Sequence, residues 1–219
     1  MKLIYALFGL SLVLSSCIAI QEANNVVELT QTHARIAVLP IQATVDRKIW
    51  MSHEKLLELN RIKGEETQQR IFRYLQFYSR NGSLAAEVMR PDEVNSILHG
   101  AGYPNTSLNN NALCSLLHVD AIIYGRINIE EPISEAAAIA LSSANNNFTP
   151  ITNIVELNLI LYDAKSAKQI WDSQQVNRGQ LGSIKENMQR QVCRRAVRNL
   201  PYNIKKRRYK KAYQQLNGF

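Results

Sequence analysis

Cys114 and His118 are the residues whose types and spacing come closest to a reactive site. They lie four positions apart at the end of a predicted helix, residues 109–117, so they can share one helix face. A thiol and an imidazole placed in this way could act as a nucleophile with its base, or as two metal ligands. Two ligands do not make a metal site, and no second pair in the sequence has metal-like spacing. The simpler alternative, a core thiol and a histidine at a helix end, is favoured.

Other motifs that could carry chemistry are incomplete. Gly100 and Gly102 lack a preceding strand and a third glycine, so they do not predict a nucleotide-binding loop. Glu130 and Glu131 are adjacent, so in a strand they point to opposite faces and cannot share a substrate. The sequence has neither a nucleophile elbow nor a zincin helix. We therefore expect no catalytic, cofactor-binding or metal-binding residues, and the hypothesis is that the protein is not an enzyme.

Cys17 gives the clearest chemical signal. It follows an apolar run over residues 3–13 and the small residues Ser15 and Ser16. This pattern resembles the lipobox of bacterial lipoproteins, in which the cysteine is acylated and becomes the mature N-terminus. The resemblance implies a signal peptide at residues 1–16 and an acyl chain such as palmitate on Cys17. Because the next residue is not aspartate, it also implies sorting to the outer membrane, facing the periplasm.

Two alternatives to the lipobox remain open. An ordinary secretion signal would be cut after Ala19 or Ala23, and residues 3–20 are just long enough to remain as a transmembrane helix. All three hypotheses export the chain. Cys114 and Cys193 are then an even pair in a compartment that permits a disulfide, although buried free thiols are favoured because both lie beside apolar helix residues.

The positive charge is concentrated at the carboxyl end of the chain. The formal net charge is +8, and the stretch from Lys185 onward has eleven lysines or arginines and one acid, which gives +10. After removal of residues 1–16, the stretch 17–184 carries about −3, since only Lys2 is lost with the signal peptide. Basic runs attract nucleic acid, but export removes that partner.

The last segment, residues 201–219, is predicted to be a basic tail. As a helix it would place Tyr209, Tyr213 and Leu216 on one stripe, an amphipathic arrangement that can lie on anionic lipid or dock on an acidic partner. A solvated tail without fixed structure is an equally good prediction, because termini fray unless they are tied down. The candidate contact residues are Lys205, Lys206, Arg207, Arg208, Lys210 and Lys211.

The remaining chain is predicted to form a lipidated tether, residues 17–33, and a single α/β domain, residues 34–200. The apolar run at 34–41 lacks alternation, which indicates a strand covered on both faces. The stretch 152–163 alternates strictly and is followed by a turn and another strand, which predicts an antiparallel meander. Helical patterns separate and follow these strands, so the fold class is α/β with a mixed sheet flanked by helices.

Three strand motifs, residues 36–40, 119–127 and 155–163, together with the cysteine motif, resemble a group of bacterial envelope lipoproteins. The group includes the curli secretion-channel lipoprotein, the penicillin-binding-protein activator lipoprotein and neisserial-type uncharacterised lipoproteins. The resemblance implies a fold like the amino-terminal domain of the Tol-system propeller protein. Two features depart from the group: Ala167 occupies a turn position that often holds glycine, and the insertion at 131–150 is rich in alanine and asparagine.

The resulting functional hypothesis is a lipid-anchored, non-enzymatic adapter or accessory subunit of an envelope complex. The alternative is a secretion pore that assembles from several copies of the protein as a homo-oligomer, with residues 131–150 as the membrane-inserting element. That segment does not alternate and has better helix propensity, so the adapter is preferred.

The lipid-anchor hypothesis predicts the behaviour of a Cys17→Ser variant. Without acyl chains the protein should be released from membranes or remain as unprocessed precursor, because each buried CH₂ contributes about 0.8 kcal/mol to attachment. Fractionation and labelling with radioactive palmitate measure this. Equal membrane retention of both proteins, or no label in the wild type, would contradict the hypothesis.

Overall fold

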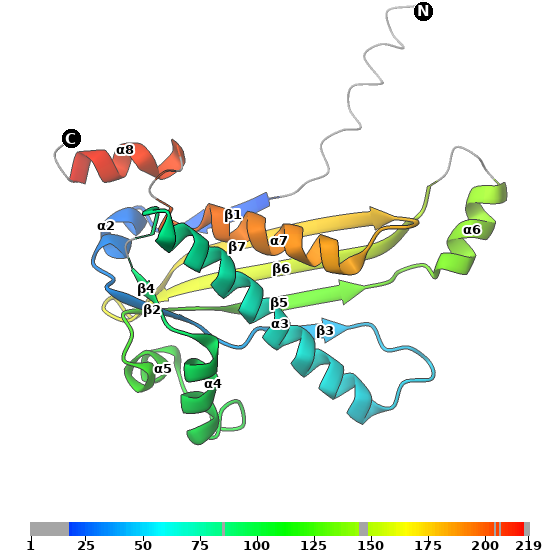
Figure 1. Cartoon of the computed structure of the whole chain (residues 1–219), viewed down its shortest axis with the longest axis horizontal. Coiled ribbons are helices and arrows are strands. Elements are labelled where there is room, and N and C mark those ends of the chain that lie inside the picture. Colours follow the sequence, from blue (N-terminus) through cyan, green and yellow to red (C-terminus); the bar gives the residue numbers. More distant parts are fainter. Residues whose placement is uncertain (1–17, 85, 145–148, 204, 206, 217–219) are drawn as a thin grey trace, which may run out of the picture.

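A single mixed sheet organises the molecule (Figure 1). The computed structural model describes residues 18–84, 86–144, 149–203, 205 and 207–216. The sheet has seven strands in the order β1-β7-β6-β5-β2-β4, and β3 also pairs with β5. β5, β6 and β7 form an antiparallel meander, whereas β2 and β3 lie parallel to β5, which confirms the predicted architecture. The strands are β1 (Ile18–Glu22), β2 (Arg35–Val38), β3 (Gln42–Val45), β4 (Glu87–Val88), β5 (Ala121–Glu130), β6 (Ile151–Asp163) and β7 (Lys168–Gln180).

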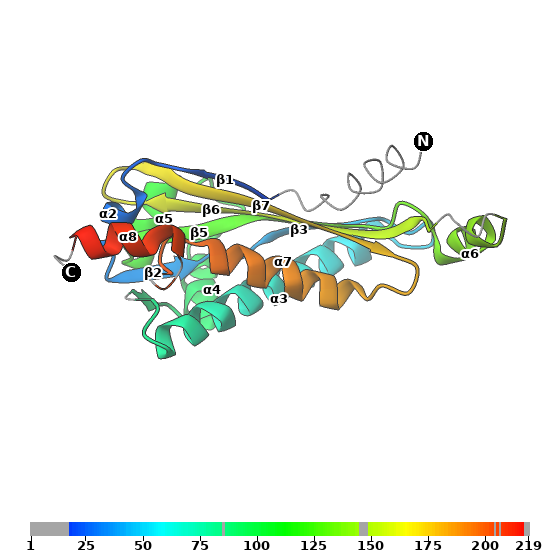
Figure 2. The same ribbon diagram turned by 90° about the horizontal axis from the view of Figure 1, so that it is seen from above.

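Helices cover both faces of this sheet (Figure 2). α3 and α7 pack on one face over a large apolar cluster, and α4 and α5 cover a smaller cluster on the other. Among the described residues, no helix combines the length and apolar character needed to cross a bilayer. The helices are α2 (Val26–Gln31), α3 (His53–Arg80), α4 (Pro91–Gly100), α5 (Asn110–Leu117), α6 (Glu135–Ala144), α7 (Lys185–Asn199) and α8 (Arg207–Leu216).

Strand burial follows the sequence patterns. Ile36, Ala37 and Val38 of β2 are all buried because helices cover both faces there, which explains the apolar run without alternation. In β6 the buried positions alternate from Val155 to Leu161, as predicted for the meander. In the turn between β6 and β7, Ala167 has a φ of 54°, the left-handed conformation that favours glycine.

The prediction that residues 17–33 form a tether is wrong from Ile18 onward. β1 adds to the sheet as an antiparallel edge strand on β7, and α2 buries Val26 and Val27 in the main apolar cluster. Strand and helix are each too short for a periodic pattern to be recognised, and the pairing with β7 stabilises β1 only in the folded molecule. The predicted signal peptide and the acylated Cys17 lie outside the described residues.

The predicted basic tail is also partly folded onto the domain. Tyr202 and Tyr209 are buried, and the Tyr209 hydroxyl donates to the Asn199 carbonyl oxygen at 3.1 Å. The Tyr213 hydroxyl donates to the Pro201 carbonyl oxygen at 3.0 Å. The predicted stripe therefore forms, but its tyrosines pack against protein. The folded unit consequently extends at both ends beyond the predicted limits of 34 and 200.

Gly64 lets the long helix α3 approach the segment between β2 and β3. A Cβ atom at this position would lie 2.1 Å from the Ile41 carbonyl oxygen, so no larger side chain fits without a backbone shift. Gly64 therefore determines how closely α3 packs.

A Gly64→Ala substitution tests this close contact. Alanine in a helix interior normally stabilises by up to about 1 kcal/mol relative to glycine, but here we expect a loss of about 1–3 kcal/mol, typical of overpacking. Urea unfolding measures the difference. Gly100→Ala is the matched control, because nothing lies within 4 Å of its Cβ position and it should be neutral or stabilising. Equal gains in both variants would contradict the packing argument.

Candidate functional site

The Cys114 and His118 pair does not form a site. Cys114 is buried in the cluster under α4 and α5, where burial raises the pKa of its thiol to about 11, whereas His118 is exposed at the end of α5. Cys193 is buried on the opposite face of the sheet, so the two cysteines are free thiols and no disulfide joins them. Among the described residues, no group of three or more His, Cys, Asp or Glu side chains is arranged to hold a metal ion.

The structure instead brings together His33, Asp163 and Tyr202, which are far apart in the sequence. His33 Nε2 lies 2.8 Å from Asp163 Oδ1, and His33 Nδ1 lies 2.5 Å from the Tyr202 hydroxyl oxygen. The second carboxylate oxygen of Asp163 accepts a hydrogen bond from the backbone N–H of Ser166 at 2.6 Å. Burial raises the pKa of Asp163, but the hydrogen bonds from Ser166 and His33 outweigh it and hold that pKa below its ordinary value.

These contacts make the cluster structural and leave it unsuited to proton transfer. Both ring nitrogens of His33 are engaged, and all three side chains are buried. A general base needs a free nitrogen within reach of a substrate proton, which this imidazole does not offer. The cluster joins the segment after α2, the β6–β7 turn and the segment after α7, so it secures both terminal segments to the sheet.

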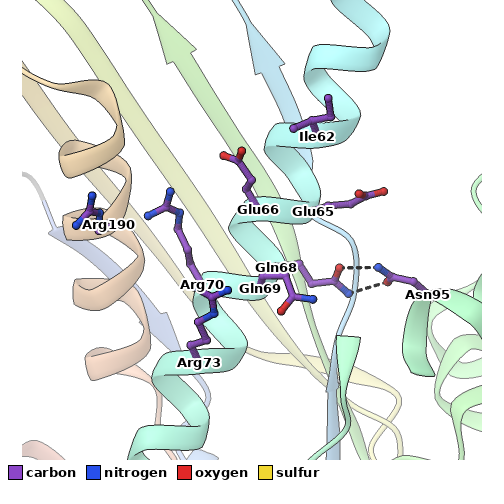
Figure 3. Close-up of a pocket in the computed structure, with 9 residues that line it drawn as sticks. All are labelled: Ile62, Glu65, Glu66, Gln68, Gln69, Arg70, Arg73, Asn95 and Arg190. Atoms are coloured by element: carbon purple, nitrogen blue, oxygen red, sulfur yellow. Dashed lines mark hydrogen bonds between the residues drawn. The ribbon is translucent and has the colours of Figure 1, made fainter. Parts of the chain in front are cut away.

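The most distinctive surface lies along α3 and α7, which border two grooves of about 650 and 500 Å³. Arginines are three of the nine residues that line the first groove, which Figure 3 shows, and four of the seven that line the second. Arg190 borders both grooves. We call this surface the arginine face. Its members are Arg70 and Arg73 from α3 and Arg190, Arg194, Arg195 and Arg198 from α7.

Buried amide side chains fix the two helices that present the arginine face. Gln189 on α7 donates from Nε2 to the Thr67 hydroxyl oxygen on α3 at 2.8 Å. Gln68 on α3 forms a reciprocal amide pair with Asn95 on α4 and also donates to the Val38 carbonyl oxygen of β2, which Figure 3 shows in part. Buried polar side chains that are fully hydrogen-bonded specify one arrangement, so the arginines are held on a rigid scaffold.

No direct ion pair holds the arginines of this face within the described part of the chain, although Glu65 and Glu66 also line the first groove. None of the six arginines has a carboxylate within ion-pair distance among the described residues. The nearby acids of α3 are already engaged: Glu65 pairs with Arg61 at 2.6 Å, and Glu66 with Lys63 at 3.0 Å. A cluster of like charges without counter-charges is a typical binding surface for a complementary, acidic partner.

The predicted contact residues of the tail lie beyond the carboxyl end of α7. Lys205 is exposed and donates to the Asn81 carbonyl oxygen at 2.7 Å, while Lys210 and Lys211 are exposed on α8. Lys206 and the side chains of Arg207 and Arg208 lie outside the described structure. The predicted contact residues were confined to this tail, so the arginine face was not predicted.

A sequence signal for the arginine face was nevertheless present. Arg190, Arg194 and Arg198 follow one another at a spacing of four, on the helix face opposite the apolar residues of α7. What the sequence could not show is that Arg70 and Arg73, more than a hundred residues earlier, lie beside them.

Comparisons with known proteins give fold-level similarity. No family model and no curated protein matches the chain. Similar solved structures include a variant of the PelC dodecamer from Paraburkholderia phytofirmans (TM-score 0.48, 8% identity, covering 85% of this chain and 98% of that one). Lipoprotein GNA1162 from Neisseria meningitidis has a TM-score of 0.37 and 12% identity, and the match covers 69% of this chain and 84% of that one. The LpoB C-terminal domain from Escherichia coli has a TM-score of 0.36 and 12% identity, and the match covers 67% of this chain and 84% of that one.

An Asp163→Asn substitution tests the buried cluster. We expect a loss of about 3 kcal/mol near neutral pH, because a charged hydrogen-bonding partner is removed from a buried pair. The pKa of Asp163 is lower in the folded protein than the value of about 3.9 for an unfolded chain. The charged Asp163 side chain therefore makes its full contribution to the free energy of unfolding above about pH 4, and this contribution declines as the pH falls below that value.

Urea unfolding at a series of pH values measures this effect. The difference between wild type and variant should be constant above about pH 4 and narrow below it. Asp172→Asn on β7 is the control and should change stability by less than about 0.5 kcal/mol. A difference that stays constant down to strongly acidic pH would contradict a charged Asp163.

Proposed function

We propose that this protein is a lipid-anchored outer-membrane lipoprotein, facing the periplasm, that acts as a non-enzymatic adapter of an envelope complex. The complex would assemble the envelope, secrete material or synthesise cell wall. The arginine face is the docking surface, and its partner is a protein with an acidic surface. The observation that carries this proposal is the rigid group of six arginines without ion-pair partners among the described residues.

The chemistry of arginine supports a protein-docking role. Arginine is enriched at protein interfaces because its planar guanidinium donates several hydrogen bonds and pairs with carboxylates in a bidentate manner. The two grooves beside these arginines offer recesses in which partner side chains can be desolvated. The exposed Lys210 and Lys211 extend the positive charge beyond α7, so we assign the tail to the same partner contact.

The pore alternative is not favoured. Within the described part of the insertion, residues 135–144 form α6, a helix of ten residues. Such a helix is about 15 Å long, half the roughly 30 Å of a bilayer's hydrocarbon core. Its helical conformation also agrees with the propensity of the alanine-rich sequence. An adapter needs no membrane-spanning element of its own, since the acyl chains on Cys17 would hold it at the membrane.

Charge reversal on α7 tests the docking surface. Combined Arg190→Glu and Arg194→Glu substitutions should weaken partner binding at least about tenfold, because two attractive contacts become repulsive and each 1.4 kcal/mol corresponds to a factor of ten. Crosslinking in cells, followed by purification from gently solubilised membranes and mass spectrometry, measures the recovery of partner proteins.

The matched control combines Arg90→Glu with Arg178→Glu. Arg90 is exposed just before α4. Asn177 of β7 contacts α7, and successive residues of a strand point to opposite faces, so the exposed Arg178 lies on the face of the sheet away from α7. The control should recover the partner as the wild type does. Recovery of no specific partner by the wild type, or equal losses in both double variants, would refute the proposal.

A further inference from the structure

Exposed apolar side chains gather at one end of the molecule. The loop between β3 and α3 exposes Ile49 completely and Trp50 by 72%. The loop between β7 and α7 exposes Leu181 and Ile184, and α6 exposes Ile139 and Leu141. Figures 1 and 2 both place these two loops and α6 at the same end, opposite α8. We call this end the apolar end and define it by these six residues.

Strand pairing confirms that the two loops share this end. Val45 at the end of β3 pairs with Ile129 of β5, which pairs with Val155 of β6. β6 begins at this end, where its first residue pairs with Gln180, the last residue of β7. The segments after β3, β5 and β7 therefore all leave the sheet in the same direction.

A network of ion pairs holds these segments together. Glu131, after β5, lies 2.5 Å from Lys48 Nζ in the β3–α3 loop and 2.6 Å from Lys185 Nζ at the start of α7. Hydrogen bonds from Lys185 and Lys48 hold the pKa of Glu131 below its ordinary value, so the network is charged at neutral pH. The exposed side chains of the two loops are thus presented by a fixed framework.

The start of the described chain points toward the same end. In β1, Ile18 pairs with Gln175 and Glu22 with Trp171, so the end of β1 at Ile18 is the one that faces Gln180. Gln180 lies only five residues beyond Gln175, about 17 Å along the strand. Cys17 directly precedes Ile18. Any lipid on Cys17 would therefore bring a bilayer to this side of the molecule.

We propose that the apolar end rests in the headgroup region of the bilayer to which the chain is anchored. Tryptophan and aliphatic side chains on a polar framework are typical of proteins that lie in the membrane interface. Exposed apolar patches are costly in water, and burial in lipid removes part of that cost. This inference rests on the lipid anchor of the proposed function but not on the arginine face.

The sequence supplies a fluorescent reporter of this contact. It contains two tryptophans, and Trp171 is only 1% exposed, so Trp50 is the one that responds to its surroundings. The full-length, lipidated protein is reconstituted into phosphatidylethanolamine and phosphatidylglycerol vesicles, with or without bromine on the acyl chains. We expect a blue shift of the Trp50 emission, loss of most of its intensity with brominated lipid, and protection from acrylamide in water.

Two variants serve as controls. Trp50→Phe leaves only Trp171 and gives the background signal. Adding Phe77→Trp to that variant moves the reporter to a position that is 59% exposed. Phe77 lies 24 residues beyond His53, the first residue of α3, which follows the loop that holds Trp50. This distance is about 36 Å along the helix axis, so the new reporter should show neither quenching by brominated lipid nor protection from acrylamide.

The outcomes separate the proposals. If wild-type protein floats with the vesicles but Trp50 stays accessible to acrylamide and insensitive to bromine, the apolar end does not touch lipid and the anchor stands. Protection from acrylamide without quenching by brominated lipid would mean that a second copy covers this end, which also overturns the inference. If the protein does not float, both the anchor and the contact fail, whereas the arginine face is judged by partner recovery alone.

Discussion

The buried contact between His33 and Asp163 is the interaction on which the shape of the whole chain depends. A carboxylate removed from water must be paired and hydrogen-bonded, and here Asp163 contacts His33, which lies 130 residues earlier in the chain. The other ring nitrogen of His33 contacts the hydroxyl of Tyr202, so the cluster links three separate segments. Only one placement of the terminal segments satisfies all of these groups. The terminal elements β1, α2 and α8 are therefore integral parts of the domain, although their sequences resemble a linker and a tail.

This placement decides which surfaces are available for binding. The tyrosines of α8 face protein, so the amphipathic stripe of the carboxyl-terminal segment is not free to lie on lipid. α7 has its apolar side on the sheet and its arginines outward beside those of α3. The cost of gathering like charges is small at a solvated surface and is recovered only when an acidic partner binds.

The proposed lipid contact and the proposed protein contact would consequently be separated along the molecule. The apolar end lies on the side toward which β1 leads, while α8 lies at the other end, and the arginine face runs between them along α7 (Figure 1). A lipid-anchored adapter needs such a separation, because a partner can reach the arginines while the domain remains at the membrane. The strands of the meander, each ten to thirteen residues long, supply the distance.

The sequence by itself determined the mixed sheet, the central helices and the absence of a recognisable catalytic motif, because long segments with strong periodicity leave little choice of structure. It also indicated Cys17 as an anchor, which remains a prediction. Only the tertiary structure decided that residues 18–33 and α8 fold onto the sheet, since short segments gain their stability from distant partners such as β7 and Asp163. The arginine face and the apolar end likewise exist only in three dimensions, because each is assembled from elements that the chain visits at widely separated positions.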